Sequence, residues 1–240
     1  MEIIAVIPAR SGSKGVVDKN MRHLSGKPLI DWSIQACQRS RLIDRSIIST
    51  DSLSYAAHAQ KLGAEAPFLR PAEISGDTSS DYEFIDHLLD FLSHTQALPD
   101  VIVHIRPTTP VRDPEVIDSA IQEFISNPSV TSLRSVHMMP ESAYKCFEIG
   151  EANLLQPLGK KTGNLDTANQ PRQLFPQTYV ANGYVDVLSA AFVKEKKMIH
   201  GQKVLAFETP VTVEIDTEDD FDYIEFQISR NIKVKQNLFG

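Results

Sequence analysis

Short apolar runs alternate along the chain with longer segments in which apolar positions recur with a helical period. The runs are rich in Val and Ile, as buried strands are, and they lie at residues 3–7, 45–49, 101–105, 130–136, 182–188, 203–207 and 211–215. The periodic segments predict helices over residues 28–40, 53–62, 80–94, 114–124 and 189–197, and a last helix from Thr217. Pro28 is expected at the first helical position, and Asp113, Pro114 and Glu115 form a helix-start signature.

This order of strands and helices predicts an α/β fold with a mainly parallel sheet. In such a fold, ligands bind at the carboxyl ends of the strands. Three loops follow predicted strand ends, at residues 8–20, 70–80 and 106–112. We therefore expect the binding site where these loops meet.

The helical and strand periods weaken between residues 138 and 178, where Pro, Gly, Asn and Gln are frequent. We interpret residues 138–178 as an arm inserted into a core domain of residues 1–137 and 179–240. Such an arm could contact a second subunit or act as a mobile lid. The tail after Arg230 is short and is predicted to fray.

Composition narrows the classes of function. The chain has 240 residues, 42% of them hydrophobic, which is enough for a sizeable core. Its net charge of -7 argues against a nucleic-acid partner, because nucleic-acid surfaces need an excess of basic residues. Cys37 and Cys146 belong to no paired motif and are expected to be buried thiols. No apolar run is long enough to cross a membrane, and the first is too short for a signal peptide, so a cytoplasmic location is expected.

The loop after the first predicted strand carries three cations, Arg10, Lys14 and Lys19, followed by Asn20. Main-chain N–H groups and cationic side chains of one loop can converge on one anion, so the loop predicts a site for a nucleoside triphosphate. Neither the Walker A pattern nor the dinucleotide-binding glycine pattern is present. The alternative is a solvated basic loop on the surface.

An acidic segment lies at residues 213–223. Glu214 and Asp216 are two positions apart, so on a strand their carboxylates would share one face and could bind a hard cation such as Mg²⁺. Alternatively, Thr217 or Asp216 caps a helix, and the carboxylates that follow complement the helix dipole. The two interpretations are compatible.

Two loops contain an Arg-Pro step, at Arg70 and at Arg106. Proline keeps the preceding residue extended, which is expected to present the arginine and nearby hydroxyl groups outward. Such loops could shape a pocket for a base and a sugar, although ordinary connecting loops would look the same.

Taken in order along the chain, these segments resemble the acylneuraminate cytidylyltransferase family, the synthetases of CMP-sialic acid and related nonulosonates. The matching segments are IPARSGSKG and KN near the N-terminus, LRPAEIS and DTSS at residues 69–80, RPTTPVR at 106–112, QPRQ at 170–173, the Asn-Gly pair at 182–183 and IDTEDDF at 215–221. The resemblance covers residues 3 to about 226.

The resemblance implies a Rossmann-like nucleotidyltransferase fold, a homodimer formed through the arm, and Mg²⁺-dependent transfer of CMP from CTP to an acidic nine-carbon keto sugar. It implies CTP contacts by Arg10, Ser11, Gly12, Lys14, Lys19 and Asn20 at the phosphates and ribose, and by Arg70, Ser79 and Asp81 at cytosine. It implies sugar contacts by Arg106, Lys145, Asn182 and Arg172, the last in the partner subunit's site. The implied catalytic residues are Arg10, Lys19 and Asp216, and the implied metal ligands are Glu214 and Asp216.

The chain departs from the family pattern at three positions. The family holds Mg²⁺ with two aspartates, whereas the first carboxylate here is Glu214. Many sialic-acid enzymes have Gln at the position of Arg106 and Arg at that of Val180. These differences change how a sugar carboxylate can be held, so legionaminic acid is at least as well supported as N-acetylneuraminate.

Two other functions stay open. A Kdo or amino-Kdo cytidylyltransferase shares the fold, the nucleotide and a keto-acid sugar, but its loop usually reads R-x-x-S-x-R-x-P-G-K, unlike S-G-S-K-G here. A catalytically silent CTP-binding regulatory protein would bind CTP without releasing pyrophosphate.

Overall fold

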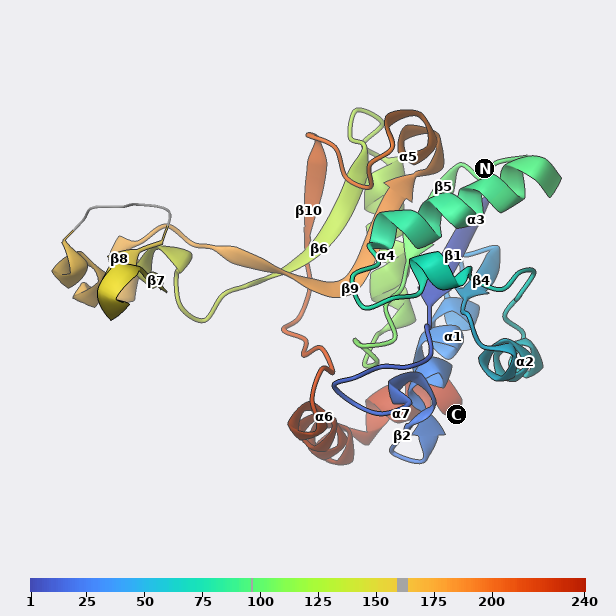
Figure 1. Ribbon diagram of the computed structural model, residues 1–240, viewed down its shortest axis with the longest axis horizontal. Helices are drawn as coiled ribbons and strands as arrows, with labels where there is room; N and C mark the ends of the chain where they lie inside the picture. Colours follow the sequence, from blue (N-terminus) through green and yellow to red (C-terminus); the bar gives the residue numbers. More distant parts are fainter. Residues whose placement is uncertain (96, 159–163) are drawn as a thin grey trace.

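A six-stranded sheet forms the centre of the computed structural model, which describes residues 1–95, 97–158 and 164–240 (Figure 1). The strands are β1 Ile3–Pro8, β4 Arg45–Ser49, β5 Val101–His104, β6 Ser132–Met138, β9 Tyr179–Ser189 and β10 Val204–Glu208, and they lie in the order β10, β6, β9, β5, β1, β4. Strand β1 pairs in parallel with β4 and β5, and β10 pairs in parallel with β6. Strand β9 is antiparallel to both of its neighbours. The prediction of a mainly parallel sheet is confirmed.

Helices cover both faces of the sheet (Figure 1). They are α1 Leu29–Arg39, α2 Leu53–Lys61, α3 Asp81–Thr95, α4 Pro114–Ile125, α5 Ala190–Lys196, α6 Glu218–Arg230 and α7 Ile232–Phe239. The predicted starts of α4 and α6 are confirmed: the Asp113 side chain accepts from the N–H of Glu115, and Thr217 forms a capping box with Asp220. Helix α1 starts one residue later than predicted, with Pro28 as its N-cap. No described helix is both long and apolar enough to span a bilayer.

The sheet divides the apolar core into two clusters. The larger lies against α1, α4, α6 and α7 and contains the fully buried Trp32, and the smaller lies beneath α3 and α5. Strand β1 contributes to both, with Ala5 and Ile7 on one face and Ile4 and Val6 on the other. This explains why its sequence is apolar at every position instead of alternating.

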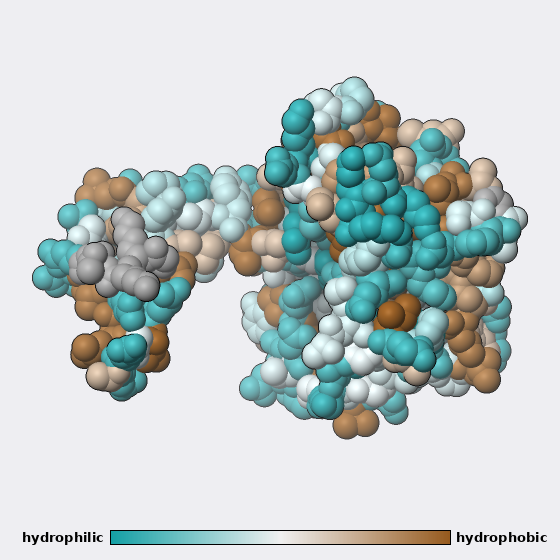
Figure 2. Space-filling view, turned by 45° about the horizontal axis from the view of Figure 1, so that its top comes forward, coloured by the Kyte–Doolittle hydropathy of each residue, from teal (hydrophilic) through white to brown (hydrophobic). Residues whose placement is uncertain are grey.

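Residues 139–158 and 164–178 project from the core as an arm, carried on the paired ends of β6 and β9 (Figure 1). The arm contains the hairpin of β7 Phe147–Ile149 and β8 Leu155–Pro157, and the 3₁₀ helices η3 Ala143–Lys145, η4 Glu151–Asn153, η5 Leu165–Asn169 and η6 Arg172–Leu174. Residues 159–163 of the predicted arm lie outside the described part of the chain. Apolar side chains are exposed on the arm (Figure 2), among them Ile149, Leu154 and Leu174.

The remaining short elements lie near the N-terminal loop and in the 70–80 loop. They are η1 Lys19–Met21, the hairpin of β2 His23–Leu24 and β3 Lys27–Pro28, and η2 Ala72–Ile74.

Two predictions near the C-terminus are wrong. Residues 211–215 are not a strand: the segment is irregular, and the N–H of Ile215 bonds to the Thr108 carbonyl at 2.8 Å. The tail after Arg230 forms α7, in which Leu238 is fully buried and the Phe239 ring stands edge-on to Trp32. An eight-residue helix is too short to show a clear period in the sequence, so its docking was not visible there.

Leu238→Ala should lower the free energy of unfolding by about 2–5 kcal/mol, because it leaves a cavity where a side chain was fully buried. Urea unfolding followed by circular dichroism measures the loss. The matched control is Leu53→Ala, since Leu53 on α2 is 74% exposed, and its effect should stay within about 0.5 kcal/mol. Equal, small effects of both changes would contradict the docking of α7.

Candidate active site

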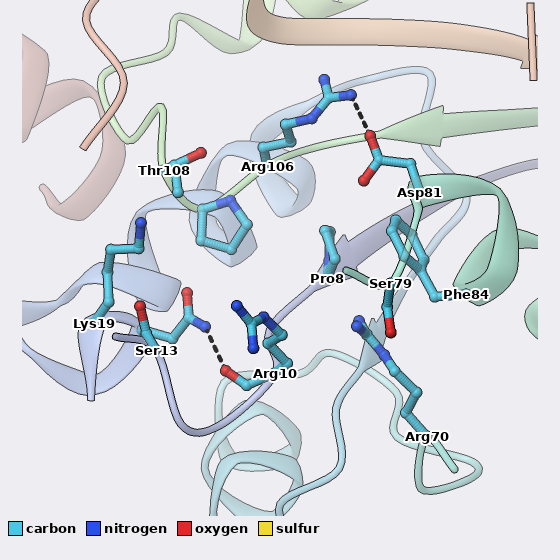
Figure 3. A pocket seen from close by; sticks show the side chains of 12 residues that line it. Pro8, Arg10, Ser13, Lys19, Arg70, Ser79, Asp81, Phe84, Arg106 and Thr108 are labelled. Carbon is cyan, nitrogen blue, oxygen red and sulfur yellow. Dashed lines mark hydrogen bonds and ion pairs between the residues drawn. The ribbon is translucent and has the colours of Figure 1, made fainter. Parts of the chain in front are cut away.

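A pocket opens at the carboxyl ends of β1 and β5 (Figure 3). Its walls come from the loop after β1, from residues 70–84 and from the loop after β5. The lining residues are Pro8, Arg10, Ser13, Lys19, Asn20, Arg70, Ser79, Asp81, Phe84, Arg106, Pro107 and Thr108. The structure thus brings the three predicted loops together. The prediction that residues 70–80 follow a strand end is wrong, because this loop comes after α2 and an isolated bridge at Glu65.

Local hydrogen bonds fix the loop after β1. The N–H and hydroxyl of Ser11 both donate to Asp51 at 2.7 Å, and the Asn20 amide donates to the Arg10 carbonyl at 3.0 Å. Burial acts to raise the pKa of Asp51, but the Ser11 hydrogen bonds outweigh it and keep that pKa below its usual value. Gly12 has a φ of 69°, which favours glycine. The donors of Ser11 and Asn20 are therefore used within the protein, where they hold the loop in shape.

Lys19 ties this loop to the segment before α6. Its ammonium donates to the Ile215 carbonyl at 2.7 Å and pairs with Asp216 at 3.1 Å, and its side chain is only 13% exposed. Gly15 adds a close approach, since a Cβ there would stand 2.4 Å from the Asp216 carbonyl oxygen. The structure thus joins Lys19 and Asp216, which the sequence identifies separately.

Arg10 and Lys14 share the carboxylate of Asp77. The guanidinium lies 2.8 Å and the ammonium 2.5 Å from the two carboxylate oxygens. Hydrogen bonds from Lys14 and then from Arg10 lower the pKa of Asp77. The Lys14 side chain is 83% exposed, so this pairing is solvated and readily exchanged for another anion.

Arg70 points inward, contrary to the sequence prediction. Its guanidinium donates to the hydroxyl and the carbonyl of Ser49 at 3.0 and 2.6 Å, and it lies 4.8 Å from the centroid of the Phe84 ring. Its main-chain N–H bonds to the Thr50 carbonyl at 2.7 Å. These contacts at the end of β4 hold the side chain in the pocket wall, where burial lowers the pKa of Arg70 to about 10.

Arg106 is held between two carboxylates. Nη1 donates to Asp186 at 2.8 Å and Nη2 donates to Asp81 at 2.7 Å. Burial would lower the pKa of Arg106, but the two carboxylates outweigh it and raise that pKa above its usual value. Next to Asp81, the Ser79 hydroxyl accepts from the Gly76 N–H at 3.0 Å. The side chain of Asp81 and both the hydroxyl and the N–H of Ser79 are thus engaged within the protein, the N–H with the Gly76 carbonyl at 3.2 Å.

Arg112 is a scaffold residue to which the sequence analysis gives no role. It is 1% exposed, and it donates to the carbonyls of Tyr184, Arg106 and Gly183 at 2.6, 2.5 and 3.0 Å. Burial lowers the pKa of Arg112 to about 10. The guanidinium therefore fixes the loop after β5 against β9, and its bond to the Arg106 carbonyl holds the main chain of Arg106 in place.

The residues expected at the sugar divide between the pocket and the arm. Arg106 lines the pocket. Lys145 pairs with Glu141 at 3.5 Å, and Arg172 donates to the Pro140 carbonyl at 2.8 Å, so both lie on the arm. The structure does not bring these two cations to the pocket wall of their own chain.

Asn182 is 3% exposed and uses its amide within the sheet. Its nitrogen donates to the Thr209 hydroxyl at 2.7 Å and lies 3.1 Å from a ring nitrogen of His137, and its oxygen accepts from the Tyr184 N–H at 3.2 Å. This placement gives Asn182 a supporting role and lends no support to the predicted direct sugar contact.

Glu214 and Asp216 lie in the irregular segment before α6, so the argument from a shared strand face does not hold. A Cβ on Gly183 would stand 2.4 Å from the Glu214 carboxylate, which therefore lies against β9. No group of three His, Cys, Asp or Glu side chains forms a metal site in the described ranges. Neither residue belongs to the pocket lining, and the Asp216 carboxylate is paired with Lys19. Two carboxylates are donors of the kind that Mg²⁺ takes when phosphate oxygens and water supply the rest of its coordination.

Sequence reasoning missed several lining residues, namely Pro8, Ser13, Phe84, Pro107 and Thr108. Each lies in or beside a segment that the sequence singled out, but small and apolar side chains carry no chemical signal of their own. Asp77 falls within the DTSS motif, and its place beside a cationic loop in space could not be read from the sequence.

Comparison with known proteins agrees with this geometry. A model of the cytidylyltransferase family matches residues 4–228. The chain belongs to the cytidylyltransferase family. A CMP-N,N'-diacetyllegionaminic acid synthase of Legionella pneumophila is 30% identical over 230 residues, which cover 94% of this chain and 95% of that protein. An N-acylneuraminate cytidylyltransferase of Escherichia coli O18:K1:H7 is 29% identical over 236 residues, which cover 98% of this chain and 53% of that longer protein.

A solved structure supports the fold of this cytidylyltransferase. A CMP:2-keto-3-deoxy-manno-octonic acid synthetase complexed with CTP aligns with a TM-score of 0.69 over 96% of this chain and 99% of its own, at 14% identity. The predicted family and the nucleotidyltransferase fold are confirmed. The roles of single residues stay predictions.

Asp51→Asn should destabilise this cytidylyltransferase more at neutral pH than at acidic pH. The pKa of Asp51 lies below its unfolded value of about 3.9, so the ionised carboxylate stabilises the fold above that value and ceases to do so as the pH falls through the folded pKa. Urea unfolding of wild type and variant at neutral pH and in steps below about pH 4 measures the difference. A difference independent of pH would contradict the Ser11–Asp51 contact.

Proposed function

We propose that the chain transfers CMP from CTP to the anomeric hydroxyl of a nonulosonic acid of the legionaminic type and releases pyrophosphate. The observation that carries this proposal is the pocket in which Arg10, Lys19, Arg70 and Arg106 face one space (Figure 3). A triphosphate and an acidic sugar both need such cations. Relatives named CMP-N,N'-diacetyllegionaminic acid synthase and N-acylneuraminate cytidylyltransferase support the choice of substrates.

In this proposal the loop after β1 binds the triphosphate. Arg10 and Lys14 exchange the Asp77 carboxylate for phosphate oxygens, which carry more charge. Gly12 lets the main chain approach the phosphates, because its left-handed backbone carries no side chain. Asn20, bonded to the Arg10 carbonyl, keeps the loop in shape while the ribose lies beside it.

Cytosine recognition falls to Arg70 and to the main chain of residues 79–81. Ser49 fixes the guanidinium of Arg70 through two hydrogen bonds. The remaining N–H groups can donate to O2 of cytosine, and main-chain groups near Ser79 and Asp81 can meet its N3 and N4 edge. Because this arginine is held in place before the ligand arrives, little rotamer freedom is lost on binding.

The reaction forms a bond from the anomeric oxygen to the α-phosphorus and breaks the bond from that phosphorus to pyrophosphate. Lys19, held by the Ile215 carbonyl, is placed in advance to stabilise negative charge on the transferred phosphoryl group. Glu214 and Asp216 would hold Mg²⁺, which supplies charge neutralisation at the phosphate oxygens when bound. Glu214 is one methylene longer than the aspartate of the family pattern, so the preference for Mg²⁺ over Mn²⁺ should be measured.

A homodimer is part of the proposal. Lys145 and Arg172 lie on the arm, and they can meet a sugar only in a site towards which the arm of another subunit reaches. Ile149, Leu154 and Leu174 are 72%, 67% and 67% exposed, as expected of a surface that a second copy covers. Such an interface should bury more than about 1,000 Å².

Pyrophosphate release tests the reaction and the substrate together. The assay contains CTP, Mg²⁺ and in turn N,N'-diacetyllegionaminic acid, N-acetylneuraminate, pseudaminic acid or Kdo, with UTP, ATP and GTP as control nucleotides. We expect release with CTP and a nonulosonic acid. Release with Kdo alone would favour the Kdo enzyme, and CTP binding without release from any acid would favour the regulatory protein.

Lys19→Ala should lower kcat by about 10²–10³, because one preorganised cation at the reacting phosphate is lost. Lys61→Ala is the matched control, since Lys61 is exposed on α2, and it should keep the wild-type rate. Turnover of Lys19→Ala near the wild-type value would exclude Lys19 from catalysis.

Mixed dimers test whether Arg172 acts in the partner's site. Lys19→Ala and Arg172→Ala should each be nearly inactive alone, but a mixed dimer contains one site free of both changes. Random exchange of subunits should therefore restore about a quarter of wild-type activity. No gain on mixing, or a stable monomer by light scattering, would contradict the shared site.

A further inference from the structure

A row of polar, titratable side chains crosses the sheet beneath Arg106. Strands β5, β9 and β6 are neighbours, and their register places His104 opposite Asp186 and Asp186 opposite Arg134. The row lies on the face covered by α3, where the His104 ring is 5.3 Å from the Phe84 ring of the pocket wall. A carboxylate at this position in an apolar strand needs a compensating charge.

Arg106 supplies that charge. Asp186 is 1% exposed and accepts from Arg106 at 2.8 Å through Oδ2, while Oδ1 lacks a hydrogen-bond partner within the described residues and lies 3.7 Å from Nε of Arg134. His104 stays neutral, because burial and then the nearby Arg106 lower its pKa well below the usual value. Water cannot replace the Arg106 contact at so buried a carboxylate.

The other edge of the Arg106 guanidinium is paired with an exposed carboxylate. Nη2 donates to Asp81, whose side chain is 41% exposed, compared with 1% for Asp186. The buried carboxylate would lose its hydrogen-bonded cation on leaving and would keep only Arg134 at 3.7 Å, whereas the exposed one can move into water at small cost. Arginine binds planar carboxylates through parallel N–H donors, so Asp81 occupies a place suited to the carboxylate of a ligand.

We propose that Asp186 is a positioning residue that holds Arg106 as the receptor for the carboxylate of the acidic sugar, which replaces Asp81 on Nη2. This inference rests on the proposed function. Arg106 lies across the pocket from Arg10 and Arg70, which are assigned to the nucleotide, so the sugar acid has its own side of the pocket (Figure 3).

Asp186→Asn tests this role, because the amide keeps the shape of the side chain and removes its charge. Arg106 then keeps its ion pair with Asp81 but loses the ion pair with Asp186 that fixes Nη1. The KM for the sugar should rise by about tenfold or more, while the KM for CTP changes by less than about twofold. Asp81→Asn should act in the opposite direction and lower the KM for the sugar, because the competing carboxylate is gone.

Asp31→Asn is the matched control. Asp31 is also buried, at 5% exposure, and it lies 2.7 Å from His58 between α1 and α2, outside the pocket wall. The same chemical change there should leave the KM for the sugar at its wild-type value. If Asp186→Asn fails to fold, the double variant Arg106→Gln/Asp186→Asn removes both charges together, and it should lose most of the wild-type preference for the sugar acid over its neutral methyl ester.

An unchanged KM for the sugar in Asp186→Asn, or an equal rise in both KM values, would overturn the positioning role. So would a double variant that prefers the acid to the methyl ester as strongly as wild type does. Calorimetric titration of the CTP-loaded protein with N,N'-diacetyllegionaminic acid separates this inference from the reaction. Binding by wild type without pyrophosphate release would refute the proposed function, yet the loss of affinity in Asp186→Asn would still decide the role of Asp186. Absence of binding to wild type would overturn both.

Discussion

Neutralisation of clustered cations by carboxylates is the interaction on which the pocket depends. Brought together without partners, these cations would repel one another, an effect already visible at Arg70, where Arg10 adds to the burial that lowers the pKa. The pairs that prevent this are Arg10 and Lys14 with Asp77, Lys19 with Asp216, and Arg106 with Asp81 and Asp186. The exposed carboxylates, Asp77 and Asp81, are solvated and weakly held. An incoming anion can therefore take the place of a carboxylate, and it does not have to displace water from an unpaired cation.

The sequence predicts those elements whose causes are local. Strand β1 is apolar at every position because both of its faces are buried, and α4 and α6 begin at capping side chains that the sequence displays. The failed predictions concern long-range partners. Residues 211–215 look like a strand, but the N–H of Ile215 is taken by Thr108, 107 positions earlier in the chain, and α7 is stabilised by Trp32 and not by its own short sequence.

The same distinction applies to the pocket. Arg10, Lys14 and Lys19 can be found because three cations in one loop after a buried strand form a local pattern. Asp186 and Arg112 cannot, because each is a charged residue that is held by a partner far along the chain: Arg106 lies 80 positions from Asp186, and Tyr184 lies 72 positions from Arg112. From the sequence alone, a buried and paired aspartate in an apolar strand cannot be distinguished from one at an exposed edge.

Strand β9 connects the arm to the pocket. It carries the base of the arm at Tyr179 and the buried Asp186 beneath the pocket, and between them the register with β6 shifts at a bulge. Gly183 lies in this stretch with a φ of 63°, and a Cβ there would also meet the Glu214 carboxylate at 2.4 Å and the Thr109 hydroxyl at 3.1 Å. The Asn-Gly pair is therefore a backbone requirement of the site. Because one strand sets both the direction of the arm and the place of Glu214, a displacement of β9 would disturb the arm and the segment before α6 together.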